Sequence, residues 1–545
     1  MAPRRNTPTR QIPWYQNLWE HNAVGIAVSI CILIWLLYPT KTDAFSHVYA
    51  QQQPIIDCGP DGPVKSVAII GAGSAGASAA YYLNKFKNPC DRVNVTVFER
   101  SSYVGGRSIT VNVYDDPTEP VELGASIFVE ANKNLVSAIR ELGLITTSRS
   151  SKELPGTLGV WDGLYWKFVS SESRWWTKAK LLWKYGLAPI RTQNTMKQAI
   201  GKFLKMYEEP HFPFRDLSQT AYDLGLTEAT AATGEEFLVK KGIGSPFSTD
   251  IIQASTRVNY AQNLNKIHAL ESLVCMATDG AMQVQGGNWQ IFDGMLKVAG
   301  AHVLLNTSVT SIDRRSDGTY AIDALSSNSA VQSTSYDAII LAAPLQYAGL
   351  NFQPDLPHPP QEIPYVNLHV TLFTSTSALD PQTFGLNANG KVPTTILTTI
   401  SDSQHVHPDF FSISTLRTVH NSITGNREYL YKVFSPEPLK SEFFERVLLL
   451  SPDGSPITWR YDKLWQSYPY LPPRVTFEDI QLDKEGKVWY TSGIESFISS
   501  METSSLMGMN VARLITDGWA DDDSPLEKET LGGDAPQRVQ AAEEL

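Results

Sequence analysis

The stretch from Val67 to Leu83, VAIIGAGSAGASAAYYL, constrains the fold of this chain more than any other. Its apolar start, Val67 to Ile70, is typical of a buried strand, and three glycines follow it, Gly71, Gly73 and Gly76. The first glycine permits a tight turn, the second lets the backbone approach a pyrophosphate, and the third lets the next helix pack on the strand. The first N–H groups of that helix then face the phosphates. The pattern predicts a dinucleotide site in a Rossmann-like unit.

A second strand, NVTVFER, ends in an acidic residue that fits the same site. We expect Glu99 to bind the ribose hydroxyls, with Arg100 beside it. Glu99 lies 28 residues after Gly71, more than the usual spacing of about 20, and the polar stretch 85–94 accounts for the extra length. Because a carboxylate at this place disfavours a 2′-phosphate, we do not expect NADP.

The segment after Glu99, SSYVGGRSIT, points to FAD rather than NAD. Gly105 and Gly106 again allow close backbone approach, and Arg107 follows them. The segment resembles the second FAD fingerprint of flavoproteins of the glutathione-reductase-like type, and Glu122 to Ala125 resembles their next strand and turn. We expect non-covalent FAD, since no histidine or cysteine stands at a tethering position in these motifs.

Three later segments complete the predicted FAD domain. They are a Gly-Gly turn, helix and strand from Val284 to Ile312, a buried strand from Tyr336 to Pro344, and a strand and helix near the C-terminus. That last helix, beginning near Glu502, is expected to direct its N-terminus at the flavin. The further candidate cofactor contacts are Ser74, Ala75, Gly124, Ala125, Val309, Ala343, Glu495 and Glu502.

The predicted fold class is α/β, with a parallel sheet in a discontinuous FAD-binding domain. That domain is expected to comprise 64–130, 280–345 and 478–516, and an α+β substrate domain to comprise 131–279 and 346–477. The acidic tail, 517–545, is short of apolar residues and is predicted to be disordered.

The N-terminus carries an uncharged apolar run, 23–38, between a segment 1–22 with three arginines and a linker, 39–63. The run is shorter than the roughly 20 residues that usually span a bilayer. A signal anchor, forming a transmembrane helix, is favoured over a signal peptide cleaved after Ala50. Both interpretations place the body in the lumen of the secretory pathway, where the sequons at Asn94 and Asn306 would be accessible.

Charge and cysteine content exclude several classes of protein. The net charge of −11 disfavours nucleic acid as a partner. Four cysteines, Cys31, Cys58, Cys90 and Cys275, match no zinc or CxxC spacing. They are expected to be unreactive thiols, with one luminal disulfide as the alternative. His405 and His407 lack a third ligand in the sequence, so no metal is expected.

Several separated blocks together resemble the prenylcysteine oxidase family, which includes farnesylcysteine lyases. They are LLWKYGLAPIRTQNTMKQAIGKFLKMYE, TRVNYAQNLNKIHALESLVCMA with VQGGNWQIF, YKVFSPEPL and GIESFISSMETS. The resemblance covers about 64–514 and is poor from Ser375 to Arg427, which leaves the prenyl preference open.

The resemblance implies an FAD-dependent oxidoreductase that acts on a thioether, with oxygen as acceptor, in a lysosome or vacuole. Hydride would leave C1 of a farnesyl- or geranylgeranyl-cysteine for the flavin. Water would then add, releasing cysteine, a prenyl aldehyde and hydrogen peroxide. Such chemistry requires positioning rather than a strong base. The candidate catalytic residues are Arg257, for the substrate carboxylate or the flavin edge, and Tyr260.

The long isoprenoid would need an apolar tunnel. An aromatic-rich helix offers candidates for its wall or mouth, with ordinary core packing or a membrane-dipping patch as alternatives. These candidates are Trp175, Trp176, Leu181, Leu182, Trp183 and Tyr185. Two other functions stay open, namely another FAD oxidase acting on amines or isoprenoids, and a luminal lipid-binding protein without turnover.

Overall fold

The computed structural model describes residues 64–148, 154, 156–326, 329–331, 335–400, 407–449, 457–483 and 486–522. The apolar run 23–38, Cys31, Cys58, His405 and the end of the acidic tail therefore lie outside the described residues. Within the described ranges, no helix combines the length and the apolar character needed to cross a bilayer.

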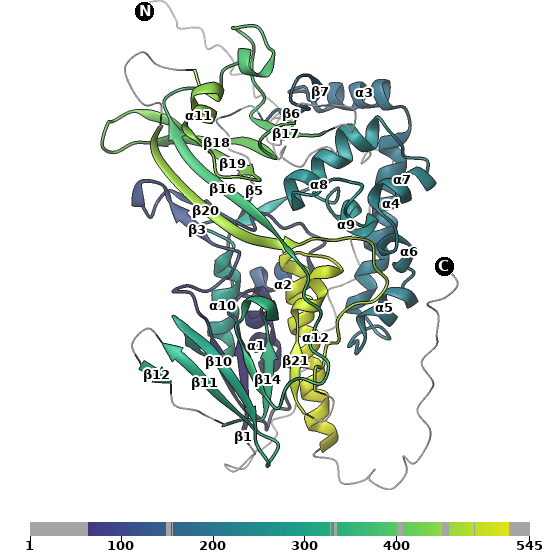
Figure 1. Cartoon of the computed structure of the whole chain (residues 1–545), viewed down its shortest axis with the longest axis vertical. Coiled ribbons are helices and arrows are strands. Elements are labelled where there is room, and N and C mark those ends of the chain that lie inside the picture. Colours follow the sequence, from purple (N-terminus) through teal and green to yellow (C-terminus); the bar gives the residue numbers. More distant parts are fainter. Residues whose placement is uncertain are drawn as a thin grey trace, which may run out of the picture.

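A five-stranded parallel sheet forms the base of the molecule (Figure 1). Its order is β21-β14-β1-β2-β9, so the chain leaves the central strand β1 toward β2 and later returns on its other side through β14. The strands are β1 (Val64–Ile70), β2 (Arg92–Phe98), β9 (His302–Leu304), β14 (Ala338–Leu341) and β21 (Val488–Tyr490). In such sheets, ligands bind at the carboxyl ends of the strands where the order reverses, which here is between β1 and β14.

Alternate residues of β1 pack on opposite faces of the parallel sheet, against two different layers. Val67 and Ile69 pack toward three helices, and Ala68 and Ile70 pack toward a second sheet. The helices are α1 (Ser74–Phe86), α10 (Trp289–Ala299) and α12 (Met501–Asp522). The second sheet consists of β10 (Thr307–Arg314), β11 (Tyr320–Ser326), β12 (Ser329–Val331), β13 (Ser335–Tyr336) and β15 (Asn351–Gln353). Burial on both faces explains the nearly continuous apolar sequence of β1.

A seven-stranded mixed sheet lies above this base in Figure 1, in the order β20-β16-β19-β18-β17-β6-β7. Its strands are β6 (Leu158–Trp161), β7 (Trp166–Val169), β16 (Tyr365–Ser375), β17 (Thr395–Thr398), β18 (Ser412–His420), β19 (Arg427–Ser435) and β20 (Ile457–Pro469). Tyr431 and Val433 pack on one face under α11 (Ser441–Val447). Leu430 packs on the other face, toward the base. The hairpin β3 (Thr110–Asn112) and β4 (Pro120–Glu122) joins that inner face.

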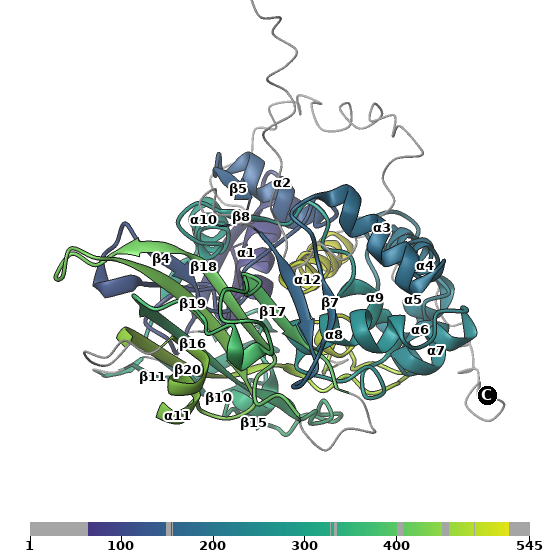
Figure 2. The same ribbon diagram turned by 90° about the horizontal axis from the view of Figure 1, so that it is seen from above.

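Helices gather at the side of the large sheet (Figure 2). They are α3 (Arg174–Tyr185), α4 (Ala188–Phe203), α5 (Leu217–Asp223), α6 (Thr227–Thr230), α7 (Gly234–Lys240), α8 (Gln253–Tyr260) and α9 (Ala269–Val274). Helix α2 (Lys133–Glu141) contacts α10 and α12, and β5 (Thr146–Ser148) pairs with β8 (Met282–Val284) in a small sheet. Helices α3 and α4 are joined by a turn at Gly186, which has φ 58°.

The structure corrects the start of the acidic tail and adds detail on the cysteines. Helix α12 continues to Asp522, whereas disorder was predicted to begin at residue 517. The helix extends this far because the side chain of Trp519 is buried in the core. Cys90 is disulfide-bonded, and Cys275 is a buried thiol outside any disulfide. Since the other two cysteines precede residue 64, the partner of Cys90 lies outside the described residues.

The contact between α1 and α12 depends on Gly508. Ser78 Oγ of α1 donates to the Ser505 carbonyl of α12 at 2.7 Å. A Cβ atom added at Gly508 would lie 2.2 Å from the Ala75 carbonyl oxygen, whereas one at Gly518 of the same helix would meet nothing within 4 Å.

Gly508→Ala should therefore destabilise the protein by about 1–3 kcal/mol through overpacking. Gly518→Ala, its control in the same helix, should be neutral or stabilise by up to about 1 kcal/mol through helix propensity. Thermal unfolding of the two variants measures the difference. Equal midpoints would show that the close approach of α1 and α12 does not hold in solution.

Candidate functional site

A cavity of about 850 Å³ lies between the parallel sheet and the large mixed sheet. The carboxyl ends of β1, β2 and β14 form its floor, and the inner face of the large sheet forms its roof. Loops 103–108 and 123–129 and the segment before α12 supply further walls. The cavity therefore occupies the place where an open parallel sheet binds its ligand.

The first turn of α1 is built to approach an anion. Gly71 has φ +109°, and an added Cβ there would lie 2.9 Å from the Ala342 carbonyl oxygen. Gly73 is the N-cap of α1, and among the described residues no side chain caps that end of the helix. A Cβ atom added at Gly73 would lie 4.0 Å from the Cα atom of Gly106. The uncapped N–H groups therefore face a cradle in which neither glycine carries a side chain.

Glu99 lies at the end of β2, where a ribose would reach it. Its Oε2 accepts from the Ala72 N–H at 2.9 Å, and its Oε1 accepts from the Ser101 N–H at 2.8 Å. These bonds hold the buried carboxylate at the cavity wall with lone pairs left for hydroxyl donors. Arg100, beside it, lines the cavity and donates to the Tyr347 carbonyl at 2.8 Å.

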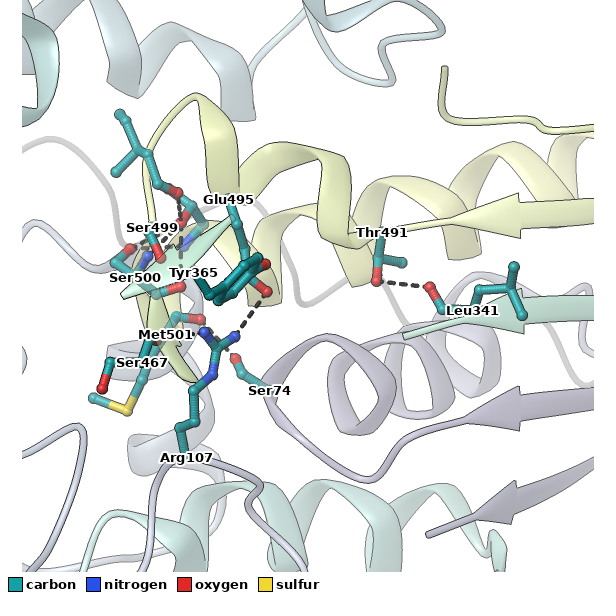
Figure 3. A network of polar contacts seen from close by, with 12 residues as sticks. Ser74, Arg107, Leu341, Tyr365, Ser467, Thr491, Glu495, Ser499, Ser500 and Met501 are labelled. Carbon is teal, nitrogen blue, oxygen red and sulfur yellow. Dashed lines mark hydrogen bonds and ion pairs between the residues drawn. The ribbon is translucent and has the colours of Figure 1, made fainter. Parts of the chain in front are cut away.

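Arg107 forms the central ion pair of the site (Figure 3). Its Nη2 lies 2.7 Å from Glu495 Oε1, and its Nη1 donates to the Ser467 carbonyl at 2.6 Å. Tyr365 donates to the other oxygen of Glu495 at 3.2 Å. Burial alone would lower the pKa of Arg107, but the Glu495 carboxylate outweighs it and raises that pKa. The pair joins the loop 103–108 to β16, β20 and the segment before α12.

The N-terminus of α12 also opens on the cavity. Ser74 Oγ of α1 donates to the Met501 carbonyl at 2.6 Å, which brings the first turns of α1 and α12 together. Ser499, Ser500, Met501 and Ser504 line the cavity there. The positive end of a long helix at this place stabilises negative charge on a ligand.

Together these features fit FAD. Two helix N-termini, a cradle of glycines and a carboxylate at the end of β2 face one cavity. Most of the predicted cofactor residues line it, namely Gly71, Gly73, Ser74, Ala75, Glu99, Arg100, Gly105, Gly106, Arg107, Gly124, Ala125, Val309, Ala343 and Glu495.

Two predicted cofactor residues do not reach the cavity. An added Cβ at Gly76 would lie 1.9 Å from the Gly71 carbonyl oxygen, so this glycine serves the packing of α1 on β1. Glu502 points away from the cavity and accepts from the N–H groups of Asn134 and Leu135 at 2.8 and 3.0 Å. The expectation for Glu502 is therefore corrected, because its carboxylate caps the N-terminus of α2.

The roof of the cavity combines apolar side chains with polar ones, among them two lysines, Lys432 and Lys463. Lys432 of β19 is buried, and its Nζ donates to the Glu122 carbonyl at 2.8 Å and to Ser126 Oγ at 3.1 Å. The apolar residues that line the cavity include Phe128, Val258, Val274, Ala277, Leu368, Val370 and Phe434. A long apolar chain with a charged end matches this surface.

Tyr260 lines the cavity, whereas Arg257 does not. The Tyr260 hydroxyl donates to the Ser499 carbonyl at 2.9 Å, and its ring contacts Tyr468 at 5.1 Å. Arg257 is buried behind the wall, where it donates to the Thr398 carbonyl at 3.1 Å and to Asn263 at 2.9 Å. Burial lowers the pKa of Arg257 to about 10. In this position its guanidinium contacts neither a cofactor nor a substrate in the cavity.

The aromatic helix α3 does not line the cavity either. Leu181 and Tyr185 are buried in the core, while Trp175, Trp176, Leu182 and Trp183 are exposed at the surface. The prediction of a tunnel wall is therefore wrong for this helix, which turns its three tryptophans outward. Within the described residues, no cluster of histidine, cysteine and acidic side chains could hold a metal ion.

The sequence analysis missed the residues of the roof. Lys432, Tyr365, Ser467 and Tyr468 all line the cavity from β16, β19 and β20. A signal existed for Lys432, because a single lysine interrupts the apolar alternation of YLYKVF, on the same face as Leu430 and Phe434. The other three come near the site only through strand pairing distant in sequence.

The comparisons with known proteins agree with this geometry. The model of the family described as prenylcysteine lyase matches residues 168–528, and that of an NAD(P)-binding Rossmann-like domain matches residues 69–142. Prenylcysteine oxidase 1 of Rattus norvegicus is 29% identical over 87% of this chain and 93% of its own length. Farnesylcysteine lyase of Arabidopsis thaliana is 27% identical over 90% of this chain and 94% of its own.

Solved structures show the same fold at low identity. A triple mutant of putrescine oxidase aligns with a TM-score of 0.54 at 15% identity, over 84% of this chain and all of that chain. Cyclohexylamine oxidase from Brevibacterium oxydans aligns with a TM-score of 0.53 at 15% identity and the same coverage. The Rossmann-like α/β class predicted from the sequence is thereby confirmed, and so is the family resemblance.

Glu271 of α9 provides a test of the packing behind the site. Its Oε2 accepts from the Ser499 N–H at 3.2 Å, next to the N-terminus of α12. Burial raises the pKa of Glu271 to about 8. Because the folded protein then binds this proton more tightly than the unfolded chain does, the free energy of unfolding should fall as pH rises from about 4.5 to 8.

Glu271→Gln, which resembles the protonated acid, should lose this dependence. The stability of the wild type relative to the variant should fall by up to about 1.4 kcal/mol per pH unit within that window. Thermal unfolding at pH 5.5 and pH 8 measures the effect, with exposed Glu437→Gln as the control. A constant difference between the wild type and Glu271→Gln would contradict the assignment.

Proposed function

Because the chain belongs to the prenylcysteine lyase family, we propose that it is an FAD-dependent oxidase that cleaves the thioether of a prenylcysteine. One molecule each of oxygen and water is consumed, and free cysteine, a prenyl aldehyde and hydrogen peroxide are formed. One observation carries the proposal. A single cavity joins the dinucleotide cradle of Gly73 and Gly106 to an apolar roof with one buried ammonium, that of Lys432.

Most of the catalytic task is positioning. FAD, when bound, accepts the hydride and returns the electrons to oxygen. The hydrogen that leaves C1 is allylic and adjacent to sulfur, so the substrate itself stabilises the developing cation. The protein has to hold C1 against the cofactor and exclude bulk water. In keeping with this, no histidine lines the cavity in the part of the chain that the structure describes.

The two ends of a prenylcysteine need different surroundings. The isoprenoid fits the apolar roof formed by Leu368, Val370 and Phe434. A buried carboxylate requires a cation, and Arg107 already neutralises Glu495. Two lysines line the cavity, and Lys432 is buried whereas Lys463 is only partly buried. We therefore assign the α-carboxylate of the cysteine portion to the Lys432 ammonium.

The FAD domain is of the glutathione-reductase-like type and is assembled from 64–130, 280–345 and 478–516. All five strands of the parallel sheet fall within these segments, which supports the assignment. Arg107 and Tyr260, which both line the cavity, contact the flavin or the substrate.

The body of the protein lies in the lumen of the secretory pathway, in a lysosome or vacuole. The N-terminal apolar run, 23–38, anchors it to the membrane. The disulfide at Cys90 suits an oxidising compartment. Asn94 and Asn306 are both exposed, as glycan attachment requires. Treatment of the full chain with an endoglycosidase tests this location, because loss of glycans should change its electrophoretic mobility. The double variant Asn94→Gln/Asn306→Gln is the control and should show no such change.

Anaerobic mixing of the full chain with S-farnesylcysteine tests the function. The absorbance of oxidised flavin should disappear, and admission of air should yield hydrogen peroxide and farnesal. A flavin that stays oxidised with both farnesyl- and geranylgeranyl-cysteine would contradict the proposal.

Lys432→Met refines the same experiment. Loss of the ammonium should raise KM for S-farnesylcysteine at least tenfold, which corresponds to about 1.4 kcal/mol of lost binding. The methyl ester of the same compound, which lacks the carboxylate charge, should show little change in KM. An equal loss for acid and ester would mean that Lys432 positions the roof instead of binding the carboxylate.

A further inference from the structure

The outer face of α3 is the most unusual surface of the molecule. Trp183 is 93% exposed, and Trp175 and Trp176 are more than half exposed. Leu182 and Leu187 extend the same apolar surface toward α4. In Figures 1 and 2 this helix lies at the periphery of the molecule. A group of three outward tryptophans on one helix is rare on a soluble protein surface and indicates a binding partner.

The spacing of these residues shows that they form one stripe. Trp175 and Leu182 are seven residues apart, as are Trp176 and Trp183, so both pairs recur after about two helical turns. The opposite side of the helix is anchored by Leu181 and Tyr185, which are buried in the core. Tyr185 also donates to Asp250 at 2.9 Å. The tryptophans are therefore not needed to hold α3 in place.

Charge around this stripe is opposite in sign to that of the chain. Between residues 167 and 191 the sequence holds six basic residues and one acidic residue, Glu172. The whole chain has a net charge of −11. Lys180 is exposed on α3 beside the tryptophans, whereas Lys184 pairs with the Asp250 carboxylate at 3.2 Å. Tryptophan combined with lysine is typical of helices that lie at the boundary between lipid headgroups and acyl chains.

We propose that the outer face of α3, formed by Trp175, Trp176, Leu182 and Trp183 with Lys180, docks together with Leu187 on the surface of a bilayer with anionic headgroups. The tryptophan rings enter the headgroup region, and Lys180 binds lipid phosphates or carboxylates. Through α4 and α9, α3 belongs to the helical layer that supplies Val274 to the cavity wall. The docking does not depend on the proposed reaction.

Photolabelling of the full chain tests this surface. Vesicles of phosphatidylcholine and phosphatidylserine carry a phospholipid with a diazirine in its acyl chain, and mass spectrometry locates the adducts after irradiation. A local readout is needed because the apolar run 23–38 could retain the full chain on vesicles by itself. We expect adducts on residues 174–187, reduced several-fold in vesicles of phosphatidylcholine alone.

Trp183→Ser should lower labelling of α3 several-fold while leaving the thermal midpoint unchanged, because the side chain is almost fully exposed. Ile423, which is 87% exposed on the loop between β18 and β19, is the matched control. Ile423→Ser should leave α3 labelling unchanged. Labelling of the Ile423 loop as strong as that of α3 would overturn the proposal. So would an unlabelled α3 together with a dimer that Trp183→Ser converts to a monomer, since that face would then join two copies of the chain.

Discussion

The ion pair between Arg107 and Glu495 holds the site together. Arg107 belongs to the loop that follows β2, Glu495 to the segment before α12, and their further partners Ser467 and Tyr365 to the large sheet. Three parts of the chain far apart in sequence thus meet at one charged group. Since the pair lines the cavity, its loss would leave a buried charge without a partner and separate the cradle from its roof.

This arrangement explains how an oxidase can act without an evident general base. The cradle and the helix N-termini supply fixed dipoles for the cofactor, and the roof supplies shape for an isoprenoid. In the proposed complex, Lys432 matches the charged end of the substrate, while Arg107 stays paired with Glu495.

The part of the site that depends on backbone geometry was predictable from the sequence. Gly71 and the Gly105–Gly106 pair are required by turns with positive φ that favour glycine, so their roles follow from local spacing. Glu502 and Arg257 were assigned wrongly to the cavity for a different reason. Both are polar residues next to genuine site residues, and only the rotation of their helices shows that they bind α2 and Thr398 instead.

The large sheet and α3 illustrate what sequence patterns leave open. Lys432 reaches the cavity through pairing of β19 with β16 and β18, and no local pattern specifies that register. On α3, aromatic residues occupy both faces, so periodicity alone did not show which face is buried. Tertiary contacts decided that Leu181 and Tyr185 face the core and Trp183 faces outward.

The most direct measurement is the rate of anaerobic flavin reduction with deuterated S-farnesylcysteine. Prenylcysteine also carries an amine, and solved structures with this fold include oxidases of putrescine and cyclohexylamine. If the cavity places the thioether at the cofactor, two deuterium atoms at C1 will slow reduction, and the farnesal product will keep one of them. Deuterium at Cα will then have no effect. Slowing by Cα deuterium alone would contradict the account and make the protein an amine oxidase.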